Sequence, residues 1–180
     1  IKCFPGESTV QLQDGSAVAL KDVRVGDVVR TLERSDTGSA WVPAWTRVFG
    51  FLHVDQRAMS YQYLRVDIEN ATSLHVSPKH LIFKATANDA VFADRFVRAR
   101  VAPLQPGSGD LVLHGSGHVG SVQHIQVLKV TWFGAGAYAP ITHSGTLLVD
   151  DVLASCYASV WSHELAHAVM APWRAYAAAK

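Results

Sequence analysis

Cys3, close to the start of the sequence, is the side chain with the clearest capacity for covalent chemistry. A thiol that directly follows a peptide bond can attack the preceding carbonyl and convert that amide into a thioester. The reaction needs a base for the thiol, donors that polarise the carbonyl and an acid for the departing amine. The ordinary alternative is a buried structural cysteine. If Cys3 is a nucleophile, the sequence should therefore also present a histidine beside a hydroxyl group.

Two histidines each follow a hydroxyl residue by three positions. Thr72 precedes His75, and Ser77 precedes His80. This spacing lets one turn bring a hydroxyl and an imidazole to the same point. His80 leads into an apolar run typical of a buried strand, whereas His75 lies within a strand-like run. Taken alone, either histidine is more often a surface or core residue than a catalytic one.

Two rival chemistries involve the C-terminal part of the chain. The run from His163 to His167 reads HELAH, which matches the HExxH zinc motif on an expected helix, with Glu164 as the base. No His, Asp, Glu or Cys follows it, so a third ligand would have to come from upstream. Separately, Cys3 and Cys156 could form a disulfide, which would silence the nucleophile.

The elements that would position these residues are mostly β. Short segments rich in Val, Ile, Leu or Thr are separated by turn residues such as Asp14-Gly15 and Ser77-Pro78, which favours a sandwich or barrel-like fold. A faint echo between the segments that begin at Ser16 and Ala93 is compatible with a duplicated subdomain or with two ordinary β-turn-β units. The expected strands are Ser8–Leu12, Asp27–Thr31, Leu64–Ile68, His80–Phe83, Leu111–Leu113 and His124–Thr131.

The composition changes after about Leu153 to an Ala-rich segment without turn signals before Pro172. We predict a C-terminal helix that is broken at Pro172. Its apolar side is expected to pack on the β body, with a partner or a membrane surface as alternatives. The residues at helical spacing are Tyr157, Trp161, Leu165, Ala168 and Val169.

Composition restricts the class of protein. The chain of 180 residues is 49% hydrophobic and 17% charged, which suits one domain with a small appendage and argues against disorder. The net charge of +1, without a long basic run, does not support nucleic-acid binding. No apolar stretch is long enough for a membrane span. The opening residues are typical of a segment cut from a longer precursor, and we expect no signal peptide there.

Several collinear stretches resemble one family, the C-terminal autoprocessing domain of hedgehog proteins, which is a branch of the Hint (hedgehog/intein) fold. They are CFPGESTVQLQDGSAVALKDVRVGDVV from Cys3, SPKHLIF from Ser77, AYAPITHSGTLLVDDVLASCYA from Ala137 and HELAHAVMAPWR from His163. The resemblance implies a mostly β Hint fold of two pseudo-two-fold related β subdomains, followed by a short C-terminal helical segment.

The resemblance also implies a self-acting, single-turnover autoprotease and sterol transferase. Cys3 would take the acyl group from the Lys2–Cys3 bond in an N-to-S acyl shift, and the 3β-hydroxyl of cholesterol or a related sterol would then attack the thioester. His80 would polarise the scissile carbonyl or protonate the leaving amine, and Ser77 would supply a hydroxyl. Cys156 matches a cysteine near the end of the Hint body. No metal or organic cofactor is required.

Two departures from the family pattern bear on this expectation. The family has an aspartate after a Phe-Leu pair, as the base that deprotonates the sterol; here His53 stands at that position. The neutral imidazole of His53 can accept a proton. Asp55, two residues further on, would lie on the same face of a strand as His53. Lys2 stands where the family has glycine. Ser77 replaces a threonine and keeps its hydroxyl.

The resemblance divides the chain into a residual upstream segment (1–2), a Hint autoprocessing domain (3–153) and a sterol-recognition-like helical segment (154–180) that could contact a membrane. It implies an upstream signalling domain in cis and a place in the secretory pathway (endoplasmic reticulum) and outside the cell. The alternatives are a Hint processor that uses water or a non-sterol acceptor, and a non-catalytic module that binds lipid or a partner. An intein proper is disfavoured, because the asparagine–nucleophile junction that closes splicing is missing.

Overall fold

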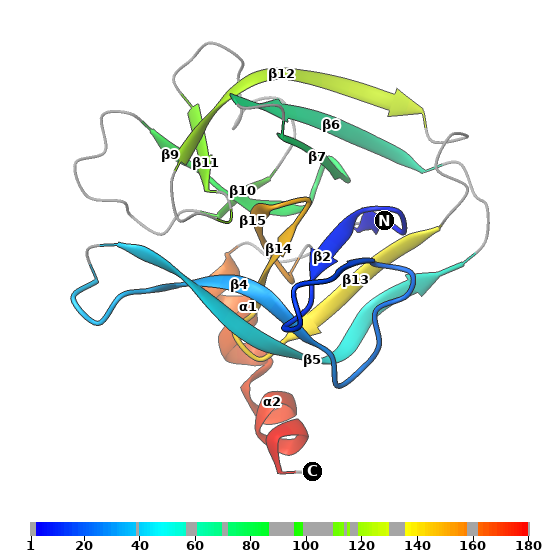
Figure 1. The fold of residues 1–180 in the computed structure, drawn as a ribbon. Coiled ribbons are helices and arrows are strands. Elements are labelled where there is room, and N and C mark those ends of the chain that lie inside the picture. Colours follow the sequence, from blue (N-terminus) through cyan, green and yellow to red (C-terminus); the bar gives the residue numbers. More distant parts are fainter. Residues whose placement is uncertain are drawn as a thin grey trace.

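The computed structural model describes residues 3–38, 40–56, 61–69, 72–86, 96–98, 110–113, 115, 119–129, 136–157 and 162–179. These form strands, most of them short, followed by two short helices, which confirms the expected mostly β class with a helical C-terminal segment (Figure 1). The strands are β1 (Phe4–Pro5), β2 (Thr9–Gln11), β3 (Ala17–Ala19), β4 (Val28–Arg34), β5 (Trp41–Asp55), β6 (Gln62–Ile68), β7 (Thr72–Val76), β8 (Leu81–Phe83), β9 (Ala85–Thr86), β10 (Phe96–Arg98), β11 (Asp110–Leu113), β12 (Val119–Lys129), β13 (Ala137–Thr142), β14 (Thr146–Val149) and β15 (Val152–Ser155).

Antiparallel pairing joins these strands into four sheets within the described ranges. Their orders are β1-β13-β5-β4, β10-β8-β15-β14, β7-β6-β12-β11-β9 and β2-β3. The long strand β5 pairs with β4 through its first half and with β13 through its second half. Figure 1 shows β6, β7 and β12 in one half of the molecule, β4, β5 and β13 in the other, and β14 and β15 between them. The first strand, β1, pairs with β13 of one half and contacts β7 of the other, so it lies where the two halves meet.

The alternation that predicted strands is present in β6. Leu64, Val66 and Ile68 are buried, whereas Arg65 is exposed and Asp67 is half-buried, as expected for a strand with one face on the core. Each of the six expected strands overlaps an observed one. The second half of the sequence echo lies largely outside the described residues.

The β14–β15 hairpin has a two-residue turn with an unusual composition. Asp150 and Asp151 have φ angles of 48° and 63°, the left-handed conformations that a type I′ turn requires at both central positions. The Asp150 carboxylate offsets part of the strain, because it accepts hydrogen bonds from the Ser8 hydroxyl and the Thr9 amide, both at 2.8 Å. The hairpin is thereby fixed to β2.

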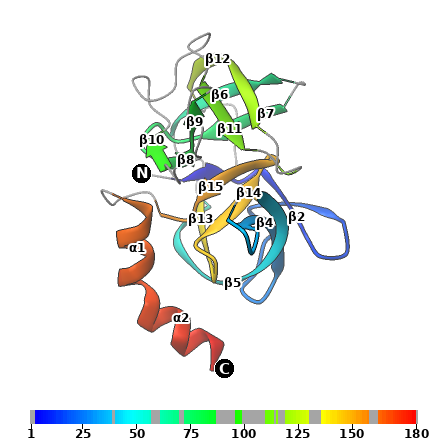
Figure 2. The same ribbon diagram turned by 90° about the vertical axis from the view of Figure 1, so that its left-hand side faces the viewer.

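Two helices, α1 (His163–Val169) and α2 (Ala171–Ala178), follow the β body. Ser162 caps α1 by accepting a hydrogen bond from the Leu165 amide. Met170 separates the helices, and Pro172 stands in the first turn of α2, so the predicted break occurs just before the proline. Figure 2 shows both helices beside the half that contains β5 and β13. Neither helix is long and apolar enough to cross a bilayer, and the described part of the chain contains no other helix that is.

The face of α1 that packs on the body differs from the prediction. Leu165 and Val169 are 55% and 66% exposed, so their expected burial is wrong. Ala166 is buried, and the two histidines of the HELAH run are half-buried against the body. The helix therefore docks through small and polar groups. Tyr157, the first residue of the predicted stripe, is buried against the body as expected. Trp161, the next, lies outside the described residues.

Candidate active site around Cys3

A pair of hydrogen bonds fixes the backbone of Cys3. The Cys3 amide donates to the Ser77 hydroxyl oxygen at 2.8 Å, and the Ser77 amide donates to the Cys3 carbonyl oxygen at 3.0 Å. Both residues are buried. Ser77 follows β7 directly, and Cys3 directly precedes β1. The nitrogen of the peptide bond that joins Cys3 to Lys2 is therefore held by a side-chain oxygen; Lys2 itself lies outside the described residues.

The turn from Ser77 to His80 brings the second histidine motif to the same place. The His80 amide donates to the Ser77 carbonyl at 3.0 Å, which closes the turn that Ser77-Pro78 predicted. The His80 ring is fully buried and packs on Phe4, with ring centroids 4.2 Å apart. Since Phe4 follows Cys3 in the chain, the imidazole lies beside the segment that carries the thiol.

The hydrogen bond of the His80 ring defines its tautomer. Nε2 lies 2.8 Å from the Ser155 carbonyl oxygen, which can only accept, so Nε2 carries the hydrogen. In the neutral imidazole Nδ1 then holds the lone pair that can take up and return a proton. Ser155, at the end of β15, was not singled out from the sequence.

Strand register places two titratable residues on the same sheet face as Cys3. Ala139 of β13 is opposite His53 of β5, and Ala137 is opposite Asp55. Extending the β1–β13 register by one residue puts Cys3 opposite Ala139, and the two belong to one buried cluster. Directly opposed residues project to the same side of a sheet. Two small alanines thus lie between the thiol and both candidate bases.

Two tyrosines cover this face. Tyr61 and Tyr63 belong to the buried cluster of Cys3, and the Tyr61 hydroxyl donates to the Asp55 carboxylate. The Tyr63 hydroxyl donates to the Gly136 carbonyl at 3.1 Å. Burial, and then the neighbouring Cys3, raise the pKa of Tyr63 well above its ordinary value. Because Tyr61 belongs to the cluster of Cys3 and donates to Asp55, it connects that cluster to the Asp55 carboxylate.

The entry into β13 depends on Gly136, which has a φ of 69°. A Cβ atom there would stand 1.7 Å from the Asp55 carbonyl oxygen. Only glycine allows this approach of the two backbones. Gly136 thus helps to fix Asp55 beside the cluster.

The two candidate bases differ in their surroundings. Asp55 is buried and bonded to Tyr61. His53 is half-buried, and its Nε2 atom, although buried, makes no hydrogen bond to any described residue. Both residues were singled out from the sequence, but the contact through Tyr61 was not. The sequence signal that His53 and Asp55 share one sheet face is their two-residue spacing along β5, matched by the two-residue spacing of Ala137 and Ala139 along β13.

Cys156 is a separate buried thiol. Neither cysteine takes part in a disulfide, so the disulfide alternative is not realised in this structure. The Cys156 sulfur lies 3.3 Å from the Thr142 hydroxyl. Burial raises the pKa of the Cys156 thiol to about 11, so it is protonated at neutral pH.

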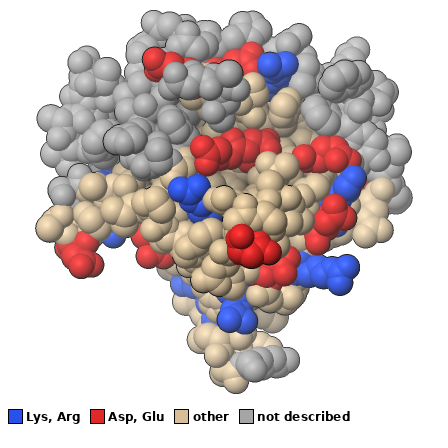
Figure 3. Space-filling view, in the orientation of Figure 1, with Lys and Arg blue, Asp and Glu red and all other residues tan. Residues whose placement is uncertain are grey.

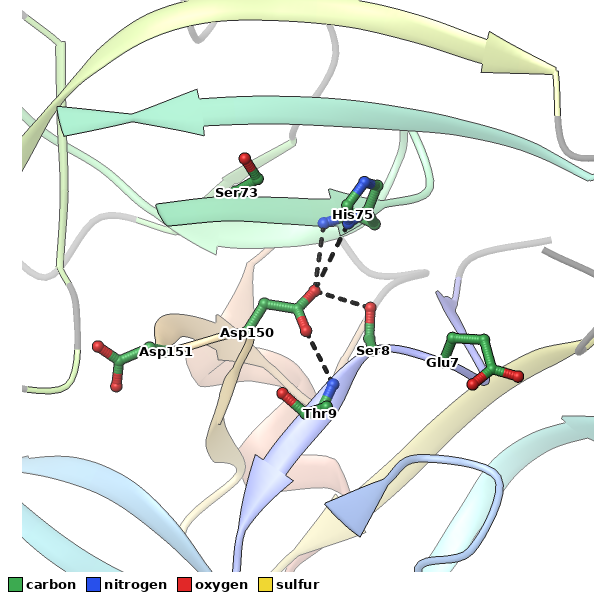
Figure 4. A pocket seen from close by; sticks show the side chains of 7 residues that line it. All are labelled: Glu7, Ser8, Thr9, Ser73, His75, Asp150 and Asp151. Atoms are coloured by element: carbon green, nitrogen blue, oxygen red, sulfur yellow. Dashed lines mark hydrogen bonds and ion pairs between the residues drawn. The ribbon is translucent and has the colours of Figure 1, made fainter. Parts of the chain in front are cut away.

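The other motif, Thr72 and His75, lies in a different place. The His75 ring faces a polar pocket, with Nδ1 3.9 Å from the Asp150 carboxylate (Figure 4). Thr72 pairs with Ile68 in the β6–β7 ladder, and its side chain lies outside the description. Figure 3 shows acidic side chains gathered across the middle of the face that contains this pocket. The structure thus brings Ser77 and His80 to Cys3, and places His75 with Asp150.

The HELAH histidines are engaged by hydroxyl groups. His163 Nδ1 lies 2.8 Å from the Ser155 hydroxyl, and His167 Nδ1 lies 2.9 Å from the Tyr157 hydroxyl. The rings stack with centroids 5.8 Å apart. Within the described ranges no three His, Cys, Asp or Glu side chains gather to hold a metal ion, and Glu164 is exposed. The part of the chain that the structure describes therefore offers no third ligand for a zinc site.

Comparisons with known proteins identify hedgehog proteins as relatives of this chain. The Indian hedgehog protein of Gallus gallus is 33% identical over 174 residues, which are 97% of this chain and 41% of that protein. Protein hedgehog of Drosophila virilis is 32% identical over 176 residues, which are 96% of this chain and 33% of that protein. The chain thus spans about two-fifths or less of the length of these relatives.

Solved structures show the same fold at low sequence identity. The gp41-1 intein superposes with a TM-score of 0.61 at 13% identity, over 86% of this chain and 98% of that one. A DnaB intein from Synechocystis gives a TM-score of 0.60 at 13% identity, over 89% of this chain and 100% of that one. The family model described as "Hint module" matches residues 1–180. The chain therefore belongs to the Hint family, with hedgehog proteins among its relatives.

Proposed function

We propose that this domain cleaves the Lys2–Cys3 peptide bond through an internal thioester at Cys3 and transfers the upstream acyl group to the 3β-hydroxyl of a sterol. The observation that carries the proposal is the hydrogen bond from the Cys3 amide to Ser77, with His80 on the same turn. Membership of the Hint family and the hedgehog relatives support it. An upstream signalling domain in cis and a place in the secretory pathway are parts of the same proposal.

The first step forms the thioester. The Cys3 sulfur attacks the Lys2 carbonyl carbon, and the thiol proton passes to the lone pair on His80 Nδ1. The bond between that carbon and the Cys3 nitrogen breaks when the nitrogen receives a proton, which His80 Nδ1 can deliver. Ser77 holds the same nitrogen at 2.8 Å, so the leaving group is aligned before the attack. The products are a thioester on Cys3 and its free amine.

The second step transfers the acyl group. The sterol oxygen attacks the thioester carbonyl, its proton passes to a base, and the Cys3 sulfur leaves and takes up a proton. Asp55 is our first candidate for this base, because Tyr61 connects it to the cluster that contains Cys3. His53 is the second, because its buried Nε2 atom projects on the same face. The steps need side chains alone, so the proposal includes no metal or organic cofactor.

The C-terminal segment, residues 154–180, is assigned to sterol and membrane contact in this proposal. Four large apolar side chains of α1 and α2 are at least half exposed, and they supply the surface for such contact. They are Leu165, Val169, Trp173 and Tyr176. The Hint body of the proposal comprises residues 3–153 and follows the upstream segment 1–2.

The test is mass spectrometry of a reporter protein fused upstream of Ile1 and incubated with cholesterol in detergent. Asp55→Asn, His53→Gln and the unchanged protein are compared, with thiol-induced cleavage as the control for thioester formation. We expect a reporter heavier by one sterol from the unchanged protein and from His53→Gln, and none from Asp55→Asn. The reverse pattern would assign the base to His53.

Two other outcomes select the alternatives. Release of an unmodified reporter in the presence of cholesterol would contradict sterol transfer and indicate hydrolysis or another acceptor. A reporter that remains intact with both thiol and cholesterol would contradict any enzymatic function and favour the alternative of a non-catalytic binding module.

A further inference from the structure

Ser155 contacts the candidate site and the C-terminal helix with two different atoms. Its carbonyl oxygen accepts the hydrogen bond from His80 Nε2 at 2.8 Å. Its hydroxyl oxygen lies 2.8 Å from His163 Nδ1, on the first residue of α1, and accepts from the Tyr157 amide at 2.9 Å. Ser155 is fully buried. One residue of β15 thus stands between the imidazole beside Cys3 and the start of the helix.

The peptide group that bears the Ser155 carbonyl is also held from the other side. Its N–H belongs to Cys156 and donates to the Gly145 carbonyl at 2.8 Å. A Cβ atom on Gly145 would stand 2.4 Å from His167 Nδ1 and 3.1 Å from a Tyr157 ring carbon. The second histidine of α1 therefore packs directly on the residue that anchors this peptide. Two contacts of α1, through His163 and through His167, converge on one peptide unit.

We infer that α1 positions His80, because His163 docked on the Ser155 hydroxyl fixes the carbonyl that orients the catalytic imidazole. This inference rests on the proposed function and extends it: the helical segment acts on thioester formation itself, in addition to any contact with the acceptor. His163 and Ser155 are positioning residues, since neither lies on the reacting atoms.

The physical reason is the fixed direction of one hydrogen bond. The bond from Nε2–H to the Ser155 carbonyl selects the tautomer of His80 and the direction of Nδ1. Loss of the His163 contact leaves the Tyr157 amide as the one remaining partner of the Ser155 hydroxyl among the described residues, and the end of β15 gains freedom to move. Small errors in the placement of a catalytic group cost up to about 100-fold in rate.

The experiment pairs a measurement of His80 with a measurement of cleavage. Long-range 1H–15N spectra of the 180-residue chain, labelled at histidine, report the tautomer and pKa of His80, whose signals are assigned with His80→Gln. The same variants carry an upstream reporter, and thiol-induced release gives the rate of thioester formation. The variants are His163→Ala and Ser155→Ala. The matched control is Glu164→Ala, an exposed position on the same helix.

We expect His163→Ala and Ser155→Ala to mix the tautomers of His80, to shift its pKa and to slow thiol-induced release about tenfold or more. Glu164→Ala should change none of these. His163→Asn, which can place a polar atom near the position of Nδ1, should restore the Nε2–H tautomer and most of the rate, which a loss of fold stability alone would not explain.

Unchanged His80 signals in His163→Ala would overturn the inference, whatever happens to cleavage. Equal release rates in His163→Ala and the unchanged protein would overturn it as well. If no variant, including the unchanged protein, releases the reporter, the proposed function fails, and the His80 spectra still decide the coupling.

Discussion

Removal of the Ser77 hydroxyl is the substitution whose cost follows most directly from the structure. Ser77→Ala leaves the buried Cys3 amide without the acceptor that now lies at 2.8 Å. An unsatisfied buried donor costs about 1–3 kcal/mol, and 1 kcal/mol corresponds to roughly 2–4 °C in a domain of this size. We therefore expect the midpoint of thermal unfolding to fall by roughly 2–12 °C. Thioester formation should slow as well, because the leaving nitrogen loses its alignment.

The assay combines differential scanning calorimetry with thiol-induced release of an upstream reporter. Ser77→Thr keeps the hydroxyl and should retain both stability and cleavage. Ser73→Ala, on the strand β7 that precedes Ser77, removes a hydroxyl that bonds to Asp67 and should leave the cleavage rate unchanged. A Ser77→Ala protein with the unfolding temperature and release rate of the unchanged chain would refute the role given to this hydrogen bond.

Three further predictions concern the attachment of the helices and the β14–β15 turn. Burial, and then Arg174, lower the pKa of His167 in the folded protein. The stability that neutral His167 contributes is therefore present above the ordinary pKa of 6.5 and is lost as the pH falls through the lower folded value. Limited proteolysis should show the helices detaching at acidic pH, and less so in His167→Gln. Gly145→Ala should destabilise the protein by more than about 1 kcal/mol in calorimetry, since the φ of 77° and the contact with His167 both oppose a Cβ atom. Asp151→Gly should raise stability by about 0.5–1 kcal/mol in urea titration, because glycine adopts its positive φ without strain; no gain would contradict the strain argument.

The sequence predicted the elements whose signal is local. Strand β6 follows from the alternation of apolar and polar residues, and the turn that carries His80 follows from Ser77-Pro78 before an apolar run. Cys3 was recognisable because its chemistry depends on the peptide bond next to it. These features need only a few consecutive residues, so a single sequence is enough to find them.

The features that escaped prediction depend on contacts between distant segments. Tyr61, which lies just before β6, acquires its role because it belongs to the buried cluster of Cys3 and also bonds to Asp55. Ser155 acts through its backbone carbonyl, which no side-chain pattern reveals. The buried face of α1 was mispredicted because helical spacing favoured Leu165, while the helix docks through hydrogen-bonding residues instead.

The central claim is that Cys3 forms a thioester with the residue before it. The most direct measurement is the intact mass of a reporter fused upstream of Ile1 after incubation with dithiothreitol, in the unchanged protein and in Cys3→Ala. The account predicts release of the reporter from the unchanged protein, with the remaining domain beginning at Cys3, and no release from Cys3→Ala. Equal release from both proteins, or a cut at any other bond, would contradict it.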